Sequence, residues 1–317
     1  MIAGELLLAC MLDVVLGDPR WLPHPVQLMG RVIAWYDSRV RRVAHGPIGE
    51  RAAGIALALG LPALSYAAGW LAIELAGRAH VMLGAVVWVL LAWTALAARD
   101  LADHALAVQL ALEQGSLERA RQAVAQIVGR DTAQLSESEV VRATVETIAE
   151  STSDGIIAPL FFLTLCGPPA ALAYKAISTL DSMVGHQDLK YRYFGWASAR
   201  LDDVVNWVPA RITAPLLVLA AGIVSWNPRR MGQAWRILQR DAHKHPSPNS
   251  GWPEAAMAGV LQVQLGGTNI YRGRREQRPY LGDPHVPLRL SHITEAVVLM
   301  WMTAFLGVAL ATGLLLL

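Results

Sequence analysis

Residues 52–98 read AAGIALALGLPALSYAAGWLAIELAGRAHVMLGAVVWVLLAWTALAA, two apolar runs separated only by the short segment Ala76–His80. Each run comes close to the roughly 20 apolar residues that a helix needs to cross a bilayer. The segment between them is too short for anything but a tight hairpin. The stretch therefore predicts two membrane helices, at residues 52–75 and 81–98.

The composition of the whole chain agrees with a membrane protein. Hydrophobic residues make up 54% of the 317 residues, charged residues make up 16%, and the mean hydropathy is +0.36. The two cysteines, Cys10 and Cys166, lie in apolar segments, so no disulfide framework is readable. Residues 2–17 have neither a basic leader nor a small-residue cleavage site, so we expect them to be retained as a membrane segment.

Six segments are candidates for insertion into the membrane. Four have interiors nearly free of charge: residues 2–17, 52–75, 81–98 and 296–317. Two are ambiguous because prolines interrupt them: residues 156–174 and 207–226. Proline lacks the backbone donor that a helix interior needs, so we expect a break at residues 167–169. No stretch is rich in β-forming residues. The predicted class is all-α, a polytopic membrane protein with about 4–6 membrane segments, some of them re-entrant.

The polar blocks between these segments set the topology. They are residues 18–51, 99–155, 175–206 and 227–294. If both ambiguous runs cross the bilayer, block 175–206 lies opposite the others; if neither crosses, all blocks share one face. We favour the second arrangement. Lys and Arg are enriched in cytoplasmic loops, and the first and last blocks are basic, so we expect these blocks to be cytoplasmic and both termini outside.

Two helix starts are readable in block 99–155. Ser116 follows the breaker Gly115 and is expected to cap a helix that runs to about Val128. Ser136 and Glu139 form a capping box that opens a helix to about Glu150.

The stretch TIAESTSDGIIAPLFFL, residues 147–163, places carboxylates beside an apolar run. Glu146, Glu150 and Asp154 recur every four residues, a spacing that brings helical side chains to one face. Such oxygen ligands suit Mg²⁺ together with water and a substrate phosphate. The alternative is structural: Arg142 pairs with Glu146, and Asp154 caps the following segment.

A second polar constellation lies in residues 174–211. Its D-D-x-x-N pattern of carboxylates and an amide suits Mg²⁺ bound to phosphate, and its basic side chains could neutralise that phosphate. The alternative is a solvated helix face with internal ion pairs. The candidate residues are Lys175, Asp181, Arg200, Asp202, Asp203, Asn206 and Arg211.

The segment SPNSGWPEAA, residues 247–256, is a turn that leads into a helix. Its exposed backbone amides could bind an anion at the helix N-terminus, or the segment could simply be a turn and cap. The residues concerned are Ser247, Asn249, Ser250 and Gly251. The chain has no phosphate-binding G-x-x-x-x-G-K-[ST] loop, so any ATP binding must use a different device.

Six ordered motifs together resemble one family. They are LGDPRWLPHPVQLMG, VGRD, ETIAESTSDGIIAPLFF, YKAISTLDSMVG, ARLDDVVNWVPAR, and SPNSGWPEAAMAGVL followed by LGG. In this order they resemble the CobD/CbiB family of cobalamin biosynthesis, that of adenosylcobinamide-phosphate synthase. The resemblance covers nearly the whole chain.

The resemblance implies an amide ligation that depends on ATP and Mg²⁺. A propionate of adenosylcobyric acid would be joined to the amine of aminopropanol or aminopropanol phosphate, giving adenosylcobinamide or its phosphate. It also implies a bacterial inner-membrane location with the active site facing the cytoplasm. The implied catalytic residues are Glu146, Glu150, Asp154, Asp181, Asp202 and Asp203, all but Asp181 also as Mg²⁺ ligands. The implied substrate-binding residues are Arg130, Lys175, Arg200, Asn206, Arg211, Ser247, Asn249, Ser250 and Gly251.

Two other functions remain open from the residues alone. A membrane transferase that uses diphosphates would suit the D-D-x-x-N pattern, and a corrinoid or anion transporter would suit broken helices with polar groups. The expected partners are the two substrates, the lipid bilayer, other membrane enzymes of cobalamin assembly and a second copy of the chain. No nucleic acid is expected.

Overall fold

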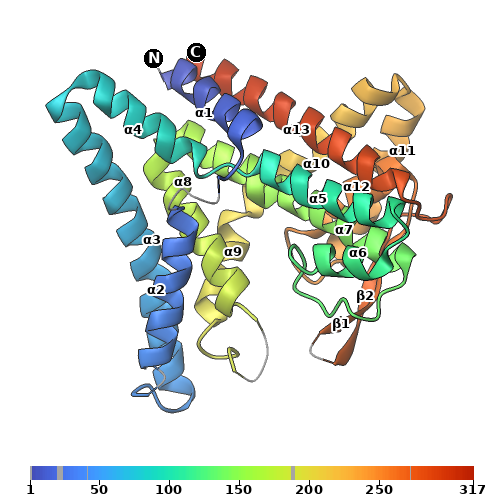
Figure 1. Ribbon diagram of the computed structural model, residues 1–317, viewed down its shortest axis with the longest axis horizontal. Helices are drawn as coiled ribbons and strands as arrows, with labels where there is room; N and C mark the ends of the chain where they lie inside the picture. Colours follow the sequence, from blue (N-terminus) through green and yellow to red (C-terminus); the bar gives the residue numbers. More distant parts are fainter. Residues whose placement is uncertain (1, 20–23, 41, 187–189, 272) are drawn as a thin grey trace. The chain divides into compact units, whose positions relative to one another are not determined.

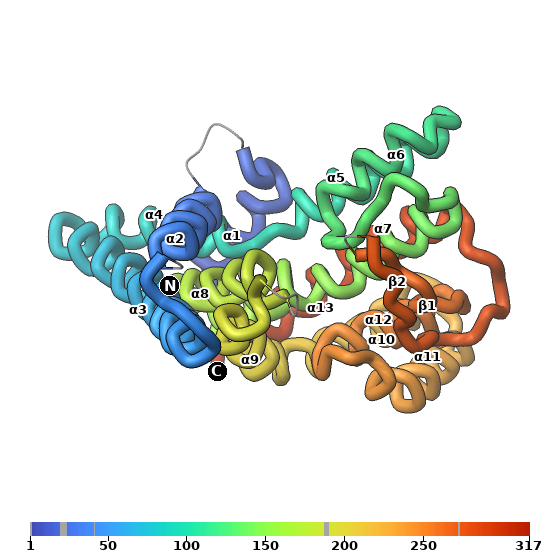
Figure 2. Tube along the Cα trace, turned by 90° about the horizontal axis from the view of Figure 1, so that it is seen from below, coloured from blue at the N-terminus to red at the C-terminus, as the bar shows by residue number. Residues whose placement is uncertain are grey.

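The computed structural model describes residues 2–19, 24–40, 42–186, 190–271 and 273–317. The chain divides into two compact units (Figures 1 and 2). Unit 1 comprises Met1–Ala97, Ala158–Asn206 and Leu310–Leu317; unit 2 comprises Ala98–Ile157 and Trp207–Ala309.

The helices of unit 1 come from two separate stretches of sequence. They are α1 (Ile2–Leu16), α2 (Pro25–Val40), α3 (Gly46–Ala79), α4 (Val81–Trp93), α8 (Ala158–Val184) and α9 (Trp196–Val205). Unit 2 is also mainly helical. Its elements are α5 (Ala98–Glu113), α6 (Leu117–Val124), α7 (Glu137–Ser151), the π-helix η1 (Thr152–Ile157), α10 (Trp207–Ser225), α11 (Pro228–Asp241), the 3₁₀ turn η2 (Ala242–Lys244), α12 (Gly251–Leu261), β1 (Leu265–Tyr271), β2 (Arg274–Leu281) and most of α13 (Ser291–Leu316).

The predicted hairpin between the first two apolar runs turns at a single residue, His80. Its backbone N–H donates to the carbonyl of Ala76 at the end of α3, and its side chain accepts from the N–H of Met82 at the start of α4. In unit 1, α3 also packs on α8, where Gly69 lies against Leu172. Small residues allow such close approach between membrane helices.

Among the residues that the structure describes, five helical segments are long and apolar enough to cross a membrane. They are Gly46–Ala79, Val81–Glu113, Glu137–Val184, Trp207–Ser225 and Ser291–Leu316. This number agrees with the predicted polytopic, all-α class. Helix α1 has only 15 residues and is not among the five. The two ambiguous runs, residues 156–174 and 207–226, fall in two of these segments, Glu137–Val184 and Trp207–Ser225. Both are therefore long and apolar enough to cross a membrane. The expected break is confirmed, because Gly167 has a non-helical φ of 72° in front of the two prolines.

The core of unit 2 lies among α5, α7, α10, α12 and α13. Both predicted caps are present: Ser116 accepts from the N–H of Arg119, and Glu139 accepts from the N–H of Ser136 at 2.8 Å. Helix α6 ends at Val124, earlier than predicted. A turn at residues 125–127 replaces its expected last turn.

An antiparallel hairpin of β1 and β2 was not predicted from the sequence. It follows α12 and contacts it (Figure 2), with an irregular register between Leu265 and Gly267. Gly266 has a φ of 87°, and a side chain there would collide with the carbonyl of Pro279. The irregularity directs the amide of Gly266 out of the ladder and towards α7, where the candidate site lies.

Candidate active site

The loop before α12 gathers four of the predicted anion-binding residues. The Ser247 hydroxyl accepts hydrogen bonds from the backbone N–H groups of Asn249 and Ser250, both at 3.2 Å. The Ser250 hydroxyl in turn donates to the carboxylate of Glu150 at 2.8 Å. A Cβ at Gly251 would meet the carbonyl oxygen of Ala242, so glycine is needed for this close approach. The loop thus holds the N-terminus of α12 beside the end of α7.

Glu146 lies at the centre of a buried ionic cluster. One carboxylate oxygen lies 2.6 Å from a guanidinium nitrogen of Arg130, and the other accepts from the N–H of Gly266 at 2.8 Å. A guanidinium nitrogen of Arg142 lies 3.9 Å from a carboxylate oxygen of Glu146. Both arginines also donate to the side-chain oxygen of Asn269, at 2.8 and 3.1 Å. The predicted Arg142–Glu146 contact is therefore present, as part of a larger network that fixes β1 to α7.

A second buried group joins His245, Glu254 and Arg278. Arg278 donates to Nε2 of His245 at 3.0 Å, and the same nitrogen lies 3.7 Å from the Glu254 carboxyl. Nδ1 of the same ring accepts a hydrogen bond from the backbone N–H of Ser247 at 3.0 Å, so the ring also supports the loop before α12.

The titration of this group follows from its burial. Burial, followed by the negative charges of Glu146 and Glu150, raises the pKa of Glu254 well above the usual range of a glutamate. Burial and the positive charge of Arg278 lower the pKa of His245. Glu254 therefore keeps its proton to a higher pH than a free glutamate, and the imidazolium of His245 loses its proton at a lower pH than a free histidine.

The cluster has an excess of positive charge when Glu254 holds its proton, the form that its raised pKa favours. Three arginines (130, 142 and 278) then face two carboxylates (146 and 150), and the N-terminus of α12 adds a partial positive charge. The buried Nε of Arg278 has no hydrogen-bond partner among the described residues. A donor without an acceptor in a cationic cluster fits a missing anionic ligand. The arrangement can therefore bind a phosphate or a carboxylate.

Arg211 and Asp154 complete the predicted residues of unit 2. The guanidinium of Arg211 stacks over Trp207 at 4.1 Å and over Trp252 at 4.7 Å, so it lies beside the first turn of α12. Asp154 is half-buried in η1. π-Helical turns are rare and often occur at functional sites. Ser153, next to it, has a buried hydroxyl without a hydrogen-bond partner among the described residues.

The D-D-x-x-N residues belong to unit 1 and form a group of their own. The Asn206 amide donates to Asp202 at 3.0 Å and accepts from the hydroxyl of Tyr174 at 2.9 Å. Asp203 pairs with Arg200 at 3.3 Å, as the structural alternative predicted. Burial raises the pKa of Asp203, although Arg200 opposes the shift. Lys175 and Asp181 lie on α8 of the same unit. A single site that joins both acidic groups remains a prediction.

No three His, Cys, Asp or Glu side chains are grouped to hold a metal ion within the part of the chain that the structure describes. Mg²⁺ usually takes only one or two protein carboxylates and completes its shell with water and substrate phosphates. The exposed carboxylate of Glu150 can serve in that way, whereas both oxygens of Glu146 are engaged by Arg130 and Gly266.

The sequence patterns missed four members of the cluster: His245, Glu254, Asn269 and Arg278. His245 and Glu254 flank the predicted S-P-N-S-G turn, so a search one turn to either side could have found them. Asn269 and Arg278 lie on the unpredicted hairpin. They reach the cluster only through tertiary packing, for which the sequence gives no local signal.

The fold and the candidate site define a polytopic membrane protein with a buried, arginine-rich polar cluster. A family model described as CobD/Cbib protein matches residues 6–300. Relatives named cobalamin biosynthesis protein CobD are 49% identical over 310 residues in Geobacter metallireducens (98% of this chain, 96% of the relative) and 46% identical over 305 residues in Klebsiella pneumoniae (96% and 95%).

A cobalamin biosynthesis protein CbiB from Salmonella typhi is 44% identical over 303 residues, which is 96% of this chain and 94% of the relative. No solved structure matches the chain. The chain belongs to the CobD/CbiB family, and its role is in cobalamin biosynthesis.

Proposed function

We propose that this protein is an adenosylcobinamide-phosphate synthase. It joins a propionate carboxylate of adenosylcobyric acid to the amine of aminopropanol or aminopropanol phosphate, at the expense of ATP and with Mg²⁺. Membership of the family supports the pathway. The observation that carries the reaction type is the excess of positive charge around the N-terminus of α12, which suits phosphate groups and a substrate carboxylate.

The reaction needs activation because a carboxylate does not react with an amine. A propionate oxygen attacks the terminal phosphorus of ATP, and ADP leaves. The amine nitrogen then attacks the acyl carbon, the bond to the phosphate oxygen breaks, and the nitrogen loses a proton to the departing phosphate. Phosphoryl transfer depends mainly on positioning and on the neutralisation of charge.

The residues of unit 2 have separate roles in this proposal. Arg130 and Arg278 bind anionic oxygens beside the N-terminus of α12, which residues 247–251 hold in place. His245 is a positioning residue, because it holds Arg278 through Nε2 and the loop before α12 through Nδ1. Glu150 and Asp154 would hold Mg²⁺, which would supply charge neutralisation at the phosphates.

In this proposal, the residues of unit 1 bind phosphate groups of the substrates and contribute to the Mg²⁺ requirement. Lys175 and Arg200 bind a phosphate of ATP or of aminopropanol phosphate; in unit 2, Arg211 has the same kind of role beside α12. Asp202 and Asp203 contribute to the Mg²⁺ requirement, and Asn206 fixes Asp202 through its hydrogen bond. We place the enzyme in the bacterial inner membrane, with the site facing the cytoplasm, where ATP and the corrinoid are found.

An assay on purified protein in detergent tests the proposal. Adenosylcobyric acid, ATP and Mg²⁺ are supplied with aminopropanol or with its phosphate, and mass spectrometry measures the amide product alongside ADP. We expect product only with ATP, at one ADP per amide formed. Product without ATP consumption would favour a transferase. Corrinoid uptake into sealed proteoliposomes without amide product would favour a transporter.

A further inference from the structure

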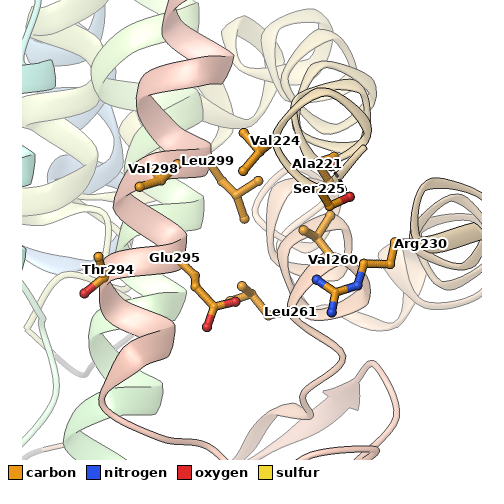
Figure 3. A pocket seen from close by; sticks show the side chains of 10 residues that line it. All are labelled: Ala221, Val224, Ser225, Arg230, Val260, Leu261, Thr294, Glu295, Val298 and Leu299. Carbon is orange, nitrogen blue, oxygen red and sulfur yellow. Dashed lines mark hydrogen bonds between the residues drawn. The ribbon is translucent and has the colours of Figure 1, made fainter. Parts of the chain in front are cut away.

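Unit 2 contains a cavity of about 230 Å³ that shares no residue with the candidate active site. Figure 3 shows that α10, α11, α12 and α13 all contribute to its walls. Its apolar wall is made by Val224, Val260, Leu261, Val298 and Leu299. Two charged side chains, Arg230 and Glu295, also line it. This combination of an apolar wall with two opposite charges is what an amphiphilic ligand requires.

The position of the cavity relates it to the membrane surface. It lies where the candidate membrane helix α10 ends, at Ser225, and where α13 begins, at Ser291. The segment that joins these two ends stays on one side of the bilayer, so both ends reach the same surface. Trp226, 89% exposed, directly follows α10. Tryptophan is enriched at this depth, between the hydrocarbon and water.

The two charges of the cavity belong to different helices. Figure 3 shows the guanidinium of Arg230, on α11, and the carboxylate of Glu295, on α13, entering the cavity from opposite walls. A simple anion would be attracted by the first and repelled by the second. A ligand that carries both a phosphate and an ammonium group would be attracted by both.

We propose that this cavity binds a membrane phospholipid with an ethanolamine headgroup. The phosphate lies at Arg230, the primary ammonium lies at Glu295, and the beginning of an acyl chain covers Val224 and Val298. Both valines are exposed in the protein alone, at 42% and 44%. The inference uses only the membrane location of α10 and α13 and does not depend on the enzymatic reaction.

Native mass spectrometry in detergent can test the lipid preference. The protein is titrated with phosphatidylethanolamine, phosphatidylcholine or phosphatidylglycerol of the same acyl chains. We expect the ethanolamine lipid to bind best, because choline has no N–H donor for Glu295 and glycerol has no positive charge. Replacing Arg230→Gln should weaken ethanolamine-lipid binding about fivefold, as for one partly exposed charge contact. Replacing Glu295→Gln should remove the preference over phosphatidylglycerol.

Two further variants control for unfolding and for general charge effects. Arg236→Gln removes a positive charge from the same helix at a residue that does not line the cavity, and it should leave the preference unchanged. Val298→Trp should fill the cavity and reduce binding of all three lipids, with circular dichroism as the check on folding. Equal binding of the three lipids by the wild type would overturn the proposal. So would an effect of Arg236→Gln as large as that of Arg230→Gln.

Discussion

The hydroxyl of Tyr191 donates a 3.2 Å hydrogen bond to the carboxylate of Asp37, across 154 positions of sequence. A Cβ at Gly54, near the start of α3, would meet the carbonyl oxygen of Phe194. Within unit 1, the loop before α9 is therefore fixed at the N-terminal end of α3. The arginine-rich residues 18–51 lead into that same end.

This relationship supports the expected topology of residues 175–206. We predict that a reporter fused after Lys190 reads cytoplasmic, as do reporters placed within residues 99–150 and 230–290. The physical reason is that Asp37 belongs to the basic block 18–51, which we expect to be cytoplasmic, and accepts a hydrogen bond from Tyr191, the neighbour of Lys190. A periplasmic reading at this position, with cytoplasmic readings at both flanks, would refute the re-entrant arrangement and make residues 156–174 and 207–226 full spans.

The exposed Glu150 should matter for catalysis more than for stability. Glu150→Gln keeps the shape and the acceptor for Ser250 but removes the charge that we assign to Mg²⁺. We expect kcat to fall by about two to three orders of magnitude and the Mg²⁺ requirement to rise, with little change in the melting temperature. Glu118→Gln, at an exposed helical position, is the matched control. Normal kcat at an unchanged Mg²⁺ requirement would exclude Glu150 from the site.

The buried Glu146 should show the opposite pattern. Glu146→Gln leaves Arg130 and Arg142 without their carboxylate partner in a buried cluster. Breaking one side of such a pair costs about 3–5 kcal/mol of unfolding free energy. Thermal unfolding in detergent should therefore show a clear loss of stability, with disorder of the β1–β2 hairpin. A stable variant with greatly reduced turnover would instead assign Glu146 a direct catalytic role, as the spacing of the acids first predicted.

Two glycine substitutions separate a required close approach from an ordinary helical position. Gly251→Ala places a methyl group against the carbonyl of Ala242 and should displace the N-terminus of α12. We expect weaker binding of ATP, measured as a raised KM, together with lower stability. Gly232→Ala lies in open space on α11 and should be neutral or stabilising by up to about 1 kcal/mol. Similar effects of both substitutions would contradict the proposed role of the loop.

The pKa of Glu254 predicts a pH dependence of stability. The folded protein holds this proton more tightly than the unfolded chain, whose glutamates titrate at about 4.3. The resulting stabilisation is complete below that pH and is lost as the pH rises through the raised pKa of the folded state. Melting temperatures of the wild type should decline as the pH rises above about 4.3 and until it has passed the raised pKa of Glu254, and Glu254→Gln should flatten that decline. Parallel curves for the two proteins would show that Glu254 does not titrate in this way.

Local signals in the sequence predicted local features correctly. Ser136 and Glu139 form their capping box, and Gly167 breaks the helix, because each depends on neighbouring residues only. Apolar length also predicted the polytopic class. The β1–β2 hairpin was missed because its residues are polar and basic, and Arg130 and Arg142 bind it from a distant part of the chain.

The spacing of the acids was informative only in part. Glu146 and Glu150 both lie on α7, but they have different environments: the first is buried among arginines and the second is exposed beside Ser250. Asp154 lies beyond α7, in the π-helix η1, where it is half-buried. Whether an acid is buried, and whether the helix around it is an α-helix or a π-helix, depends on tertiary packing. The spacing of the acids in the sequence carries no information on that packing.

The π-helix η1 also affects how the length of the chain can vary. A π-helical turn closes i→i+5 hydrogen bonds, so it holds about one residue more than an α-helical turn. Deleting one residue between Thr152 and Ile157 would let the wide turn become an ordinary α-helical turn, and the helix that follows would keep nearly the same rotation. A deletion inside α7 has no extra residue to remove, so it would rotate Ile156 and Ile157 by about 100° out of the core in which they are buried. Relatives of this chain should therefore tolerate the loss of one residue in η1 better than a loss inside α7.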